Sequence, residues 1–293
     1  MKISDFDFGF KTIHDNKFLS PGYVDSDMED TLTYCDNISY LIKADNNDNI
    51  SCIITTEELA QQINSTKGIG ISPTPRVVFY KIHNWFIENN KYKVGYEYGI
   101  GKYCDIHPTA VVSKCVKIGN NVSIGENVVI KDHVIIGDDT SIDSGAIIGC
   151  DGLLYFKDMD NIVYVKHAGG VKIGNNVTIL SNAIVARSIH NSCYTRIGDR
   201  SIIGITTNIG HEAQIDSNCV IAGNCVIARK VKICEGVWVG PSSVIREHVQ
   251  IGRKAQVKLG SVVIKNVEDN RIVSGNFAIN HNMNLKRALK TKI

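Results

Sequence analysis

The sequence predicts a mainly β fold in which very short parallel strands coil into a triangular prism, and two regularities indicate it. The first is a repeat of six: an aliphatic residue recurs at every sixth position, from Ile106 to Ile148, from Ile173 to Val185 and from Ile197 to Val263. The second lies two residues earlier, where small or β-branched residues such as Ala146 stand. Both positions then point to the same face of a short strand.

The residues after each aliphatic position predict a tight corner. Gly often follows, as at Gly119 and Gly174, and Asn pairs come next, as at Asn120 and Asn121. Gly and Asn tolerate left-handed backbone, so each hexapeptide is interpreted as strand plus corner, and three of them close one coil. This pattern is typical of the hexapeptide-repeat left-handed parallel β-helix, an exception to right-handed crossovers.

The repeat divides the chain into three predicted regions. Residues 1–100 lack it, and their alternation of strand-like segments (Leu32–Cys35, Ser51–Thr55) with helix-like ones (56–63, 77–89) predicts a small α/β domain. Residues 101–265 form the predicted β-helix. Residues 266–293 are expected to leave the prism and end in a short basic helical cap, from Met283 to Lys292.

The repeat is interrupted after Ile148 and again at Ala186–Tyr194. Insertions in such a coil emerge as loops at its corners, and loops of this kind commonly carry function.

Composition limits the classes of function. The 293 residues carry a net charge of +2 without a basic cluster, which argues against nucleic acid. No apolar run approaches the roughly 20 residues that cross a bilayer, and the N-terminal residues lack a signal-peptide core, so a cytoplasmic protein is expected. The nine cysteines have no CxxC spacing and are interpreted as reduced thiols.

Among nine histidines, His211 and His248 are the candidates for chemistry. Both fall on corner positions that face outward, 37 residues apart, so about two coils separate them along one edge. Acyl transfer to an amine needs a base for the N–H proton and donors for the oxyanion. A corner histidine can equally be an ordinary exposed residue.

A family resemblance supports the first of these histidines. The segment Asn208–Ile215, with Ile221–Gly223 after it, resembles the catalytic segment of bacterial UDP-3-O-acylglucosamine N-acyltransferases, the lipid A enzymes. That resemblance implies that His211 is the general base. Val239–His248 matches the segment that carries the family's second active-site histidine, and Gly149–Tyr155 resembles the start of its insertion.

The N-terminal region extends the resemblance. Leu32–Tyr40 is similar to the family segment in which two aromatic side chains and an Asn hold a uracil ring, which implies these roles for Tyr34, Tyr40 and Asn37. Tyr34 and Tyr40 can alternatively be ordinary core aromatics.

The sequence also departs from that family. Glu212 replaces an Asn, and Ala186–Ser188 replaces an Asp-Arg-Gly, so a different group must orient His211. A related group acylates nucleotide-linked amino sugars such as dTDP-4-amino-4,6-dideoxyglucose, the anthrose precursor, and fits at least as well.

We therefore expect an N-acyltransferase for a nucleotide-linked amino sugar, assembled as a homotrimer, with no permanently bound cofactor. A thioester of coenzyme A or of acyl carrier protein would donate the acyl group, and a short-chain acyl-CoA is expected. His248 would stabilise the oxyanion or position the donor. Further candidate contacts are Asp151, Tyr155, His167, Arg187, His190 and Glu212 for the acceptor, and Gly223, Gly240 and Arg246 for the donor.

Three alternatives remain open. The acceptor could be the lipid A intermediate UDP-3-O-acylglucosamine. A zinc enzyme of the γ-carbonic anhydrase kind needs three His ligands, two of them close in sequence, and the repeat has no close His pair, so no metal is expected. A non-catalytic trimeric assembly module would explain the prism but not the N-terminal segment.

Overall fold

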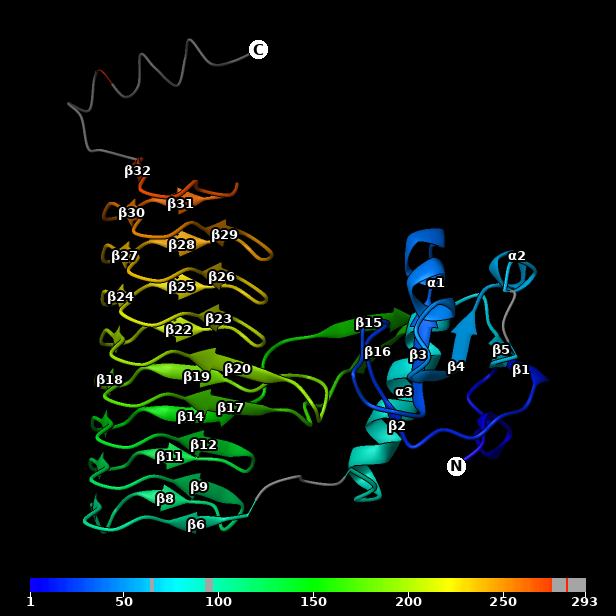
Figure 1. Cartoon of the computed structure of the whole chain (residues 1–293), viewed down its shortest axis with the longest axis horizontal. Coiled ribbons are helices and arrows are strands. Elements are labelled where there is room, and N and C mark those ends of the chain that lie inside the picture. Colours follow the sequence, from blue (N-terminus) through cyan, green and yellow to red (C-terminus); the bar gives the residue numbers. More distant parts are fainter. Residues whose placement is uncertain (64–65, 93–96, 276–282, 284–293) are drawn as a thin grey trace.

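The computed structural model describes residues 1–63, 66–92, 97–275 and 283. Figure 1 shows a tall prism and a smaller N-terminal unit beside it, joined at mid-height by a hairpin. The mainly β class and the left-handed β-helix are confirmed. No helix within the described residues is long and apolar enough to span a bilayer.

The N-terminal unit is a five-stranded sheet in the order β1-β5-β4-β3-β2, in which only β1 runs antiparallel to its neighbour. Its strands are β1 (Lys11–His14), β2 (Ser20–Pro21), β3 (Thr31–Cys35), β4 (Ile50–Thr55) and β5 (Gly68–Ile71). The helices are η1 (Ile3–Asp5), α1 (Ile38–Asp45), α2 (Glu57–Ala60) and α3 (Pro75–Glu88). Pro75 opens α3, where its missing N–H costs no hydrogen bond.

The prism consists of three parallel sheets, each named here by its first strand. The β6 face contains β6 (Gly99–Ile100), β9 (Val116–Ile118), β12 (Val134–Ile136), β17 (Gly170–Ile173), β20 (Tyr194–Ile197), β23 (Gln214–Ile215), β26 (Lys232–Ile233) and β29 (Gln250–Ile251). The β7 face contains β7 (Asp105–Ile106), β10 (Ser123–Ile124), β13 (Ser141–Ile142), β18 (Thr178–Ile179), β21 (Ile202–Ile203), β24 (Val220–Ile221), β27 (Trp238–Val239), β30 (Gln256–Val257) and β32 (Ile272–Val273). The β8 face contains β8 (Val111–Val112), β11 (Val129–Ile130), β14 (Ile147–Cys150), β19 (Ile184–Ala186), β22 (Asn208–Ile209), β25 (Val226–Ile227), β28 (Val244–Ile245) and β31 (Val262–Val263).

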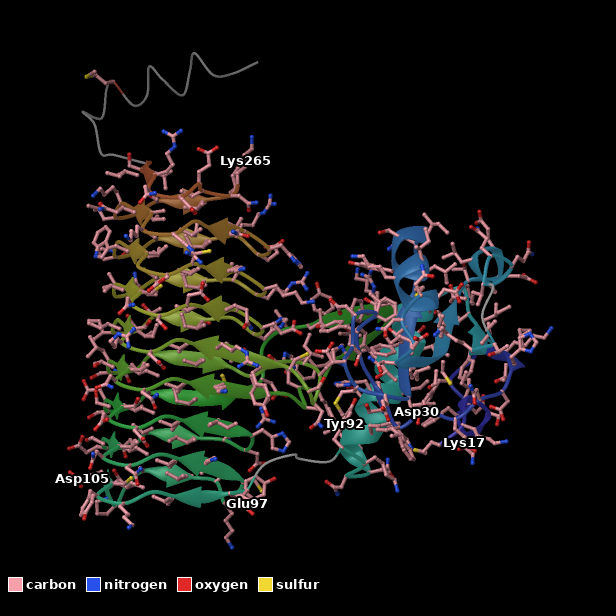
Figure 2. All side chains as sticks on the ribbon, viewed as in Figure 1. Lys17, Asp30, Tyr92, Glu97, Asp105 and Lys265 are labelled. Atoms are coloured by element: carbon pink, nitrogen blue, oxygen red, sulfur yellow. The ribbon has the colours of Figure 1, made fainter. Side chains whose placement is uncertain are left out.

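The aliphatic residues of the repeat form the core of the prism, because they stack in register from coil to coil. Ile209, for example, pairs with Val185 below and with Ile227 above, and all three are fully buried. Residues two positions earlier, such as Cys225, fill the remaining inward space. All nine cysteines are free thiols. Figure 2 shows Asp105 and Lys265 at opposite ends of this stack.

The prism extends further than the sequence predicted. Residues from 271 were expected to leave it, but Ile272 and Val273 pair in register with Gln256 and Val257, so the expected end at 265 is wrong. Val267 pairs with Ile251 only four residues after Val263, and this break in the spacing of six hid the last coil from the repeat pattern. Apart from Met283, the predicted helix over 283–292 lies outside the described residues.

Both insertions leave the prism from one row of corners, the corners that follow the strands of the β8 face. We call this row the third edge. The first insertion forms the hairpin β15 (Tyr155–Asp158) and β16 (Asn161–Tyr164), which Figure 1 shows reaching the N-terminal unit. It packs against α3: Tyr80 stacks on Phe156, with ring centroids 5.1 Å apart, and Lys81 pairs with Asp158 at 2.6 Å.

The N-terminal unit and the insertions share one hydrophobic core, because Val165 and Ile189 are buried among residues of the sheet and α3. His83 of α3 crosses the same junction, with Nδ1 2.6 Å from the Tyr92 hydroxyl and Nε2 2.9 Å from the Lys166 carbonyl oxygen. Figure 2 shows Tyr92 at this junction. The N-terminal unit is therefore held against the third edge rather than tethered beside it.

Candidate active site

The third edge places two columns of corner residues along the axis, because equivalent corners recur every 18 residues. His211, Arg229 and Glu247 form one column, and Glu212, Lys230 and His248 form the other. His211 and His248 share an edge, as expected, but they belong to different columns. The first column lines one cavity, and Lys230 and His248 of the second column line another.

The first, which we call the histidine cavity, has a volume of about 400 Å³. It is lined by the column of His211, Arg229 and Glu247, and by Asp151 and Gly152 of the first insertion. Ile184 and Asn208 on the outer side of the β8 face complete it. The cavity thus contains acidic and basic side chains beside an apolar wall.

The second, which we call the tyrosine cavity, has a volume of about 320 Å³ and lies between the N-terminal unit and the prism. Tyr23, Tyr34 and Tyr40 line it from one side, and Lys230 and His248 from the other. Lys43 adds a second cation. Aromatic rings beside cations suit a base linked to phosphates.

His211 faces outward from its corner but is only 3% exposed, because the insertion covers it. Its ring meets His167 edge-on at a centroid distance of 5.1 Å. Gly152 lies directly over both rings, and a Cβ there would stand 2.7 Å from Cδ2 of His211. Neither ring nitrogen of His211 has a hydrogen-bond partner among the described residues.

Glu212 lies beside Nδ1 of the His211 ring. Its Oε2 lies 3.4 Å from Nδ1 of His211 and 3.7 Å from Nζ of Lys230, and its Oε1 accepts a hydrogen bond from the Tyr23 hydroxyl. Burial raises the pKa of the Glu212 carboxyl, but the adjacent His211 ring, the Lys230 charge and the hydrogen bond from Tyr23 outweigh it and lower that pKa to about 2. Glu212 is therefore a buried carboxylate.

His167 is neutral beside this pair. Burial and the neighbouring His211 lower the pKa of His167 to about 4. Its Nδ1 lies 3.1 Å from the Val165 carbonyl oxygen, which requires a proton on Nδ1 and leaves Nε2 as an acceptor without a partner among the described residues.

Several other predicted contacts have structural roles. Arg187 donates to the carbonyl oxygens of Gly149, His167 and Asp132, so it clamps the bases of the loops. The Asn37 side chain accepts from the Tyr40 backbone N–H and caps α1. His190 is buried among Tyr23, Phe79, Tyr80 and His83, and that burial lowers its pKa well below its usual range.

The two aromatic residues of the predicted base-binding segment differ. Tyr34 is half-buried against Phe79 and Tyr80, with Arg76 over its ring, and still lines the tyrosine cavity. Tyr40 is 41% exposed in the same cavity. Tyr34 thus packs as a core aromatic residue and also presents part of its ring to the cavity where a base could bind.

The residues predicted to contact the acyl donor lie on two different edges of the prism. Gly223 and Gly240 lie at the corners after the β7 face, so within one chain they border the other side of the β8 face from His211. Arg246 is exposed on the third edge, next to the column of His211. Asp151 lines the histidine cavity and accepts from the His167 backbone N–H at 3.3 Å, whereas Tyr155 is exposed on the hairpin.

Sequence reasoning missed Tyr23, Arg229 and Lys230. For the last two a signal exists: they stand 18 residues after His211 and Glu212, one coil along the same edge. Tyr23 has no such signal, since its partner is 189 residues away.

Comparisons with known proteins agree with this architecture. The model of the bacterial transferase hexapeptide (six repeats) matches residues 115–150 and 194–229. The UDP-3-O-acylglucosamine N-acyltransferase of Shewanella denitrificans is 39% identical over 74 residues, 25% of this chain and 21% of that protein. The same enzyme of Delftia acidovorans is 22% identical over 139 residues, 47% of this chain and 41% of that protein.

Among solved structures, a UDP-N-acetylglucosamine acyltransferase from Campylobacter jejuni matches with a TM-score of 0.54 and 27% identity, covering 66% of this chain and 79% of that one. This chain is therefore a hexapeptide-repeat left-handed β-helix protein whose relatives include acyltransferases. It spans less than half the length of the curated relatives named here.

Proposed function

We propose that this protein is an N-acyltransferase that moves an acyl group from a thioester to the amine of a nucleotide-linked amino sugar. One observation carries the proposal: the buried imidazole of His211 has a carboxylate oxygen 3.4 Å from Nδ1, and within the described residues its Nε2 has no hydrogen-bond partner in a cavity that also contains an arginine. This is the arrangement of a base with its orienting group.

In the proposed reaction, the sugar amine attacks the thioester carbonyl carbon, and its proton passes to Nε2 of His211. The new C–N bond forms as the C–S bond breaks, and the imidazolium returns the proton to the departing thiolate. The Glu212 carboxylate stabilises the transient imidazolium. Arg229 supplies positive charge to the oxyanion from the same cavity.

The tyrosine cavity is the proposed place of the nucleotide. Tyr34 and Tyr40 provide ring surfaces for the base, and Lys43, Lys230 and His248 provide charge or donors for the diphosphate. Two acceptors fit this description: dTDP-4-amino-4,6-dideoxyglucose, and UDP-3-O-acylglucosamine, which the names of the matched relatives favour.

A homotrimer is part of the proposal. The outward side chains of the β8 face are apolar in every coil except that of Asn208, and Val111, Val226, Val244 and Val262 are between 38% and 63% exposed. The histidine cavity opens beside this face. A second copy packed on it would close the cavity and bring a corner like that of Gly223 or Gly240 towards the first copy's His211.

The test is acyl transfer itself. Purified protein is given acyl-CoA or acyl carrier protein, with each amino sugar, and thiol release and product mass are measured. His211→Asn should lower kcat by roughly 10²-fold, while His107→Asn at a half-buried corner far along the prism serves as the matched control. Absence of thiol release with every acceptor, or normal turnover of His211→Asn, would contradict the proposal.

The two donors are compared in the same assay. We expect a short-chain acyl-CoA to be the better substrate. A preference of a hundredfold or more for the carrier-bound donor would instead favour the lipid A acceptor.

A further inference from the structure

Tyr23 is the point where the N-terminal unit reaches the reactive histidine. It follows β2, and its hydroxyl donates to Oε1 of Glu212, whose other oxygen faces Nδ1 of His211. Burial and the nearby Glu212 charge raise the pKa of Tyr23 well above its usual range, so the hydroxyl remains a donor. The contact joins residues 189 positions apart.

Tyr23 is itself fixed by its ring. Nζ of Lys230 lies 4.1 Å from the ring centroid, and His190 meets the ring edge-on at 4.2 Å. Lys230 also lies beside Glu212, so one lysine holds both members of the contact. These ring contacts fix where the hydroxyl points, independently of the hydroxyl itself.

The same tyrosine lines the cavity proposed for the nucleotide. A ligand there contacts the ring whose hydroxyl holds Glu212. One side chain therefore takes part both in nucleotide binding in the tyrosine cavity and in the orientation of His211 in the histidine cavity. The two columns of corner residues do not provide this connection by themselves, because the tyrosine that contacts Glu212 comes from the N-terminal unit and not from the prism.

We propose that Tyr23 is a positioning residue, through which the N-terminal unit and its bound nucleotide sugar orient Glu212 and thereby His211. This inference rests on the proposed function. In it, Glu212 accepts from Tyr23 at Oε1, which keeps Oε2 beside Nδ1 of His211, 3.4 Å away, so that the carboxylate can accept from Nδ1–H when Nε2 takes the proton of the sugar amine. Without the hydroxyl, the carboxylate can rotate away from Nδ1.

Tyr23→Phe tests this, because it keeps the ring contacts and removes only the hydroxyl. Since a hydrogen bond to a charged group is worth roughly a factor of ten or more, we expect kcat to fall about 10-fold, with KM for the nucleotide sugar changed much less. Tyr103→Phe, at an exposed tyrosine distant from the site, is the matched control. An unchanged kcat would overturn the inference.

A double-mutant cycle separates positioning from packing. If Tyr23 acts through Glu212, Tyr23→Phe should have little further effect on kcat in a Glu212→Gln background. Glu126→Gln, at an exposed corner on another edge, is the control background, in which the full effect should persist. Simple additivity with Glu212→Gln would refute action through the carboxylate.

A second measurement needs no turnover. The ¹⁵N signals of the His211 ring should report a protonated Nδ1 in the wild type and a weaker preference for that tautomer in Tyr23→Phe. If the wild type releases no thiol, the proposed function fails, whereas this tautomer shift remains testable. If the wild type is active but kcat and the ring signals are unaffected, only the role of Tyr23 fails.

Discussion

Lowering the pH from 7 to 5 should destabilise the folded chain through two buried histidines, His83 and His167. Burial comes first among the causes that lower each pKa to about 4. The unfolded chain takes up protons near pH 6.5, so between pH 6.5 and 4 protonation favours the unfolded state. The stabilisation is present above about pH 6.5 and is lost as the pH falls towards 4.

The size of the effect follows from the two pKa values. A shift from about 6.5 to about 4 corresponds at pH 5 to about 2 kcal/mol of lost unfolding free energy for each histidine, and to only a few tenths at pH 7. His190 adds to the loss in the same direction, because its pKa is also lowered.

Urea unfolding at pH 7 and pH 5 measures this loss. In His83→Gln, whose amide can keep partners at Tyr92 and Lys166, the loss of unfolding free energy should shrink by about 2 kcal/mol. His14→Gln, at an exposed strand residue, is the control. The reasoning is refuted if His83→Gln and the wild type lose the same stability, or if the imidazole proton signal of His83 titrates near pH 6.5.

The remaining predictions concern the site and its surroundings. Gly152→Ala places a Cβ 2.7 Å from the His211 ring, so calorimetry should show a loss of about 1–3 kcal/mol from overpacking, together with lower kcat; unchanged values would mean that the loop moves freely. Val226→Glu on the β8 face should give monomers by light scattering, whereas Ser123→Glu on the β7 face should not; equal behaviour would argue against the proposed interface. Tyr34→Ala should weaken nucleotide-sugar binding by about 1–2 kcal/mol with kcat less affected; an unchanged KM with a lower melting temperature would assign the ring to the core.

The prism could be predicted from the sequence because its information is local and repeated. One inward aliphatic residue in six specifies strand, corner and register together, and the observed pairing of Ile209 with Ile227 follows from it. The end of the stack was misplaced because the spacing changes between Val263 and Val267. Periodic information thus determines the fold only as far as the period holds.

The site was predictable only in part, for the same reason. Its edge and the candidate His211 could be predicted from corner spacing and family resemblance. Glu212 was a candidate contact for the acceptor, but its place beside Nδ1 of His211 could not be predicted, because the Tyr23 hydroxyl that holds it comes from outside the repeat. The burial of His211 likewise depends on an insertion whose path no periodicity describes.

The corners of the third edge also carry a conformational cost. On the other two edges Asn is the commonest residue with positive φ, as at Asn121 and Asn218. On the third edge the non-glycine residues in this conformation include Glu212 (φ 62), Lys230 (φ 56) and His248 (φ 61). Left-handed backbone costs such side chains about 1–2 kcal/mol per residue.

Thermostability and the proposed catalysis therefore compete along one edge of this molecule. Asn at position 248 should raise the melting temperature while removing a side chain from the nucleotide cavity. Engineering for heat resistance has safer targets at the left-handed corners of the other edges, such as Arg200 and Lys254. Relief of the same backbone strain there leaves His211 and its neighbours untouched.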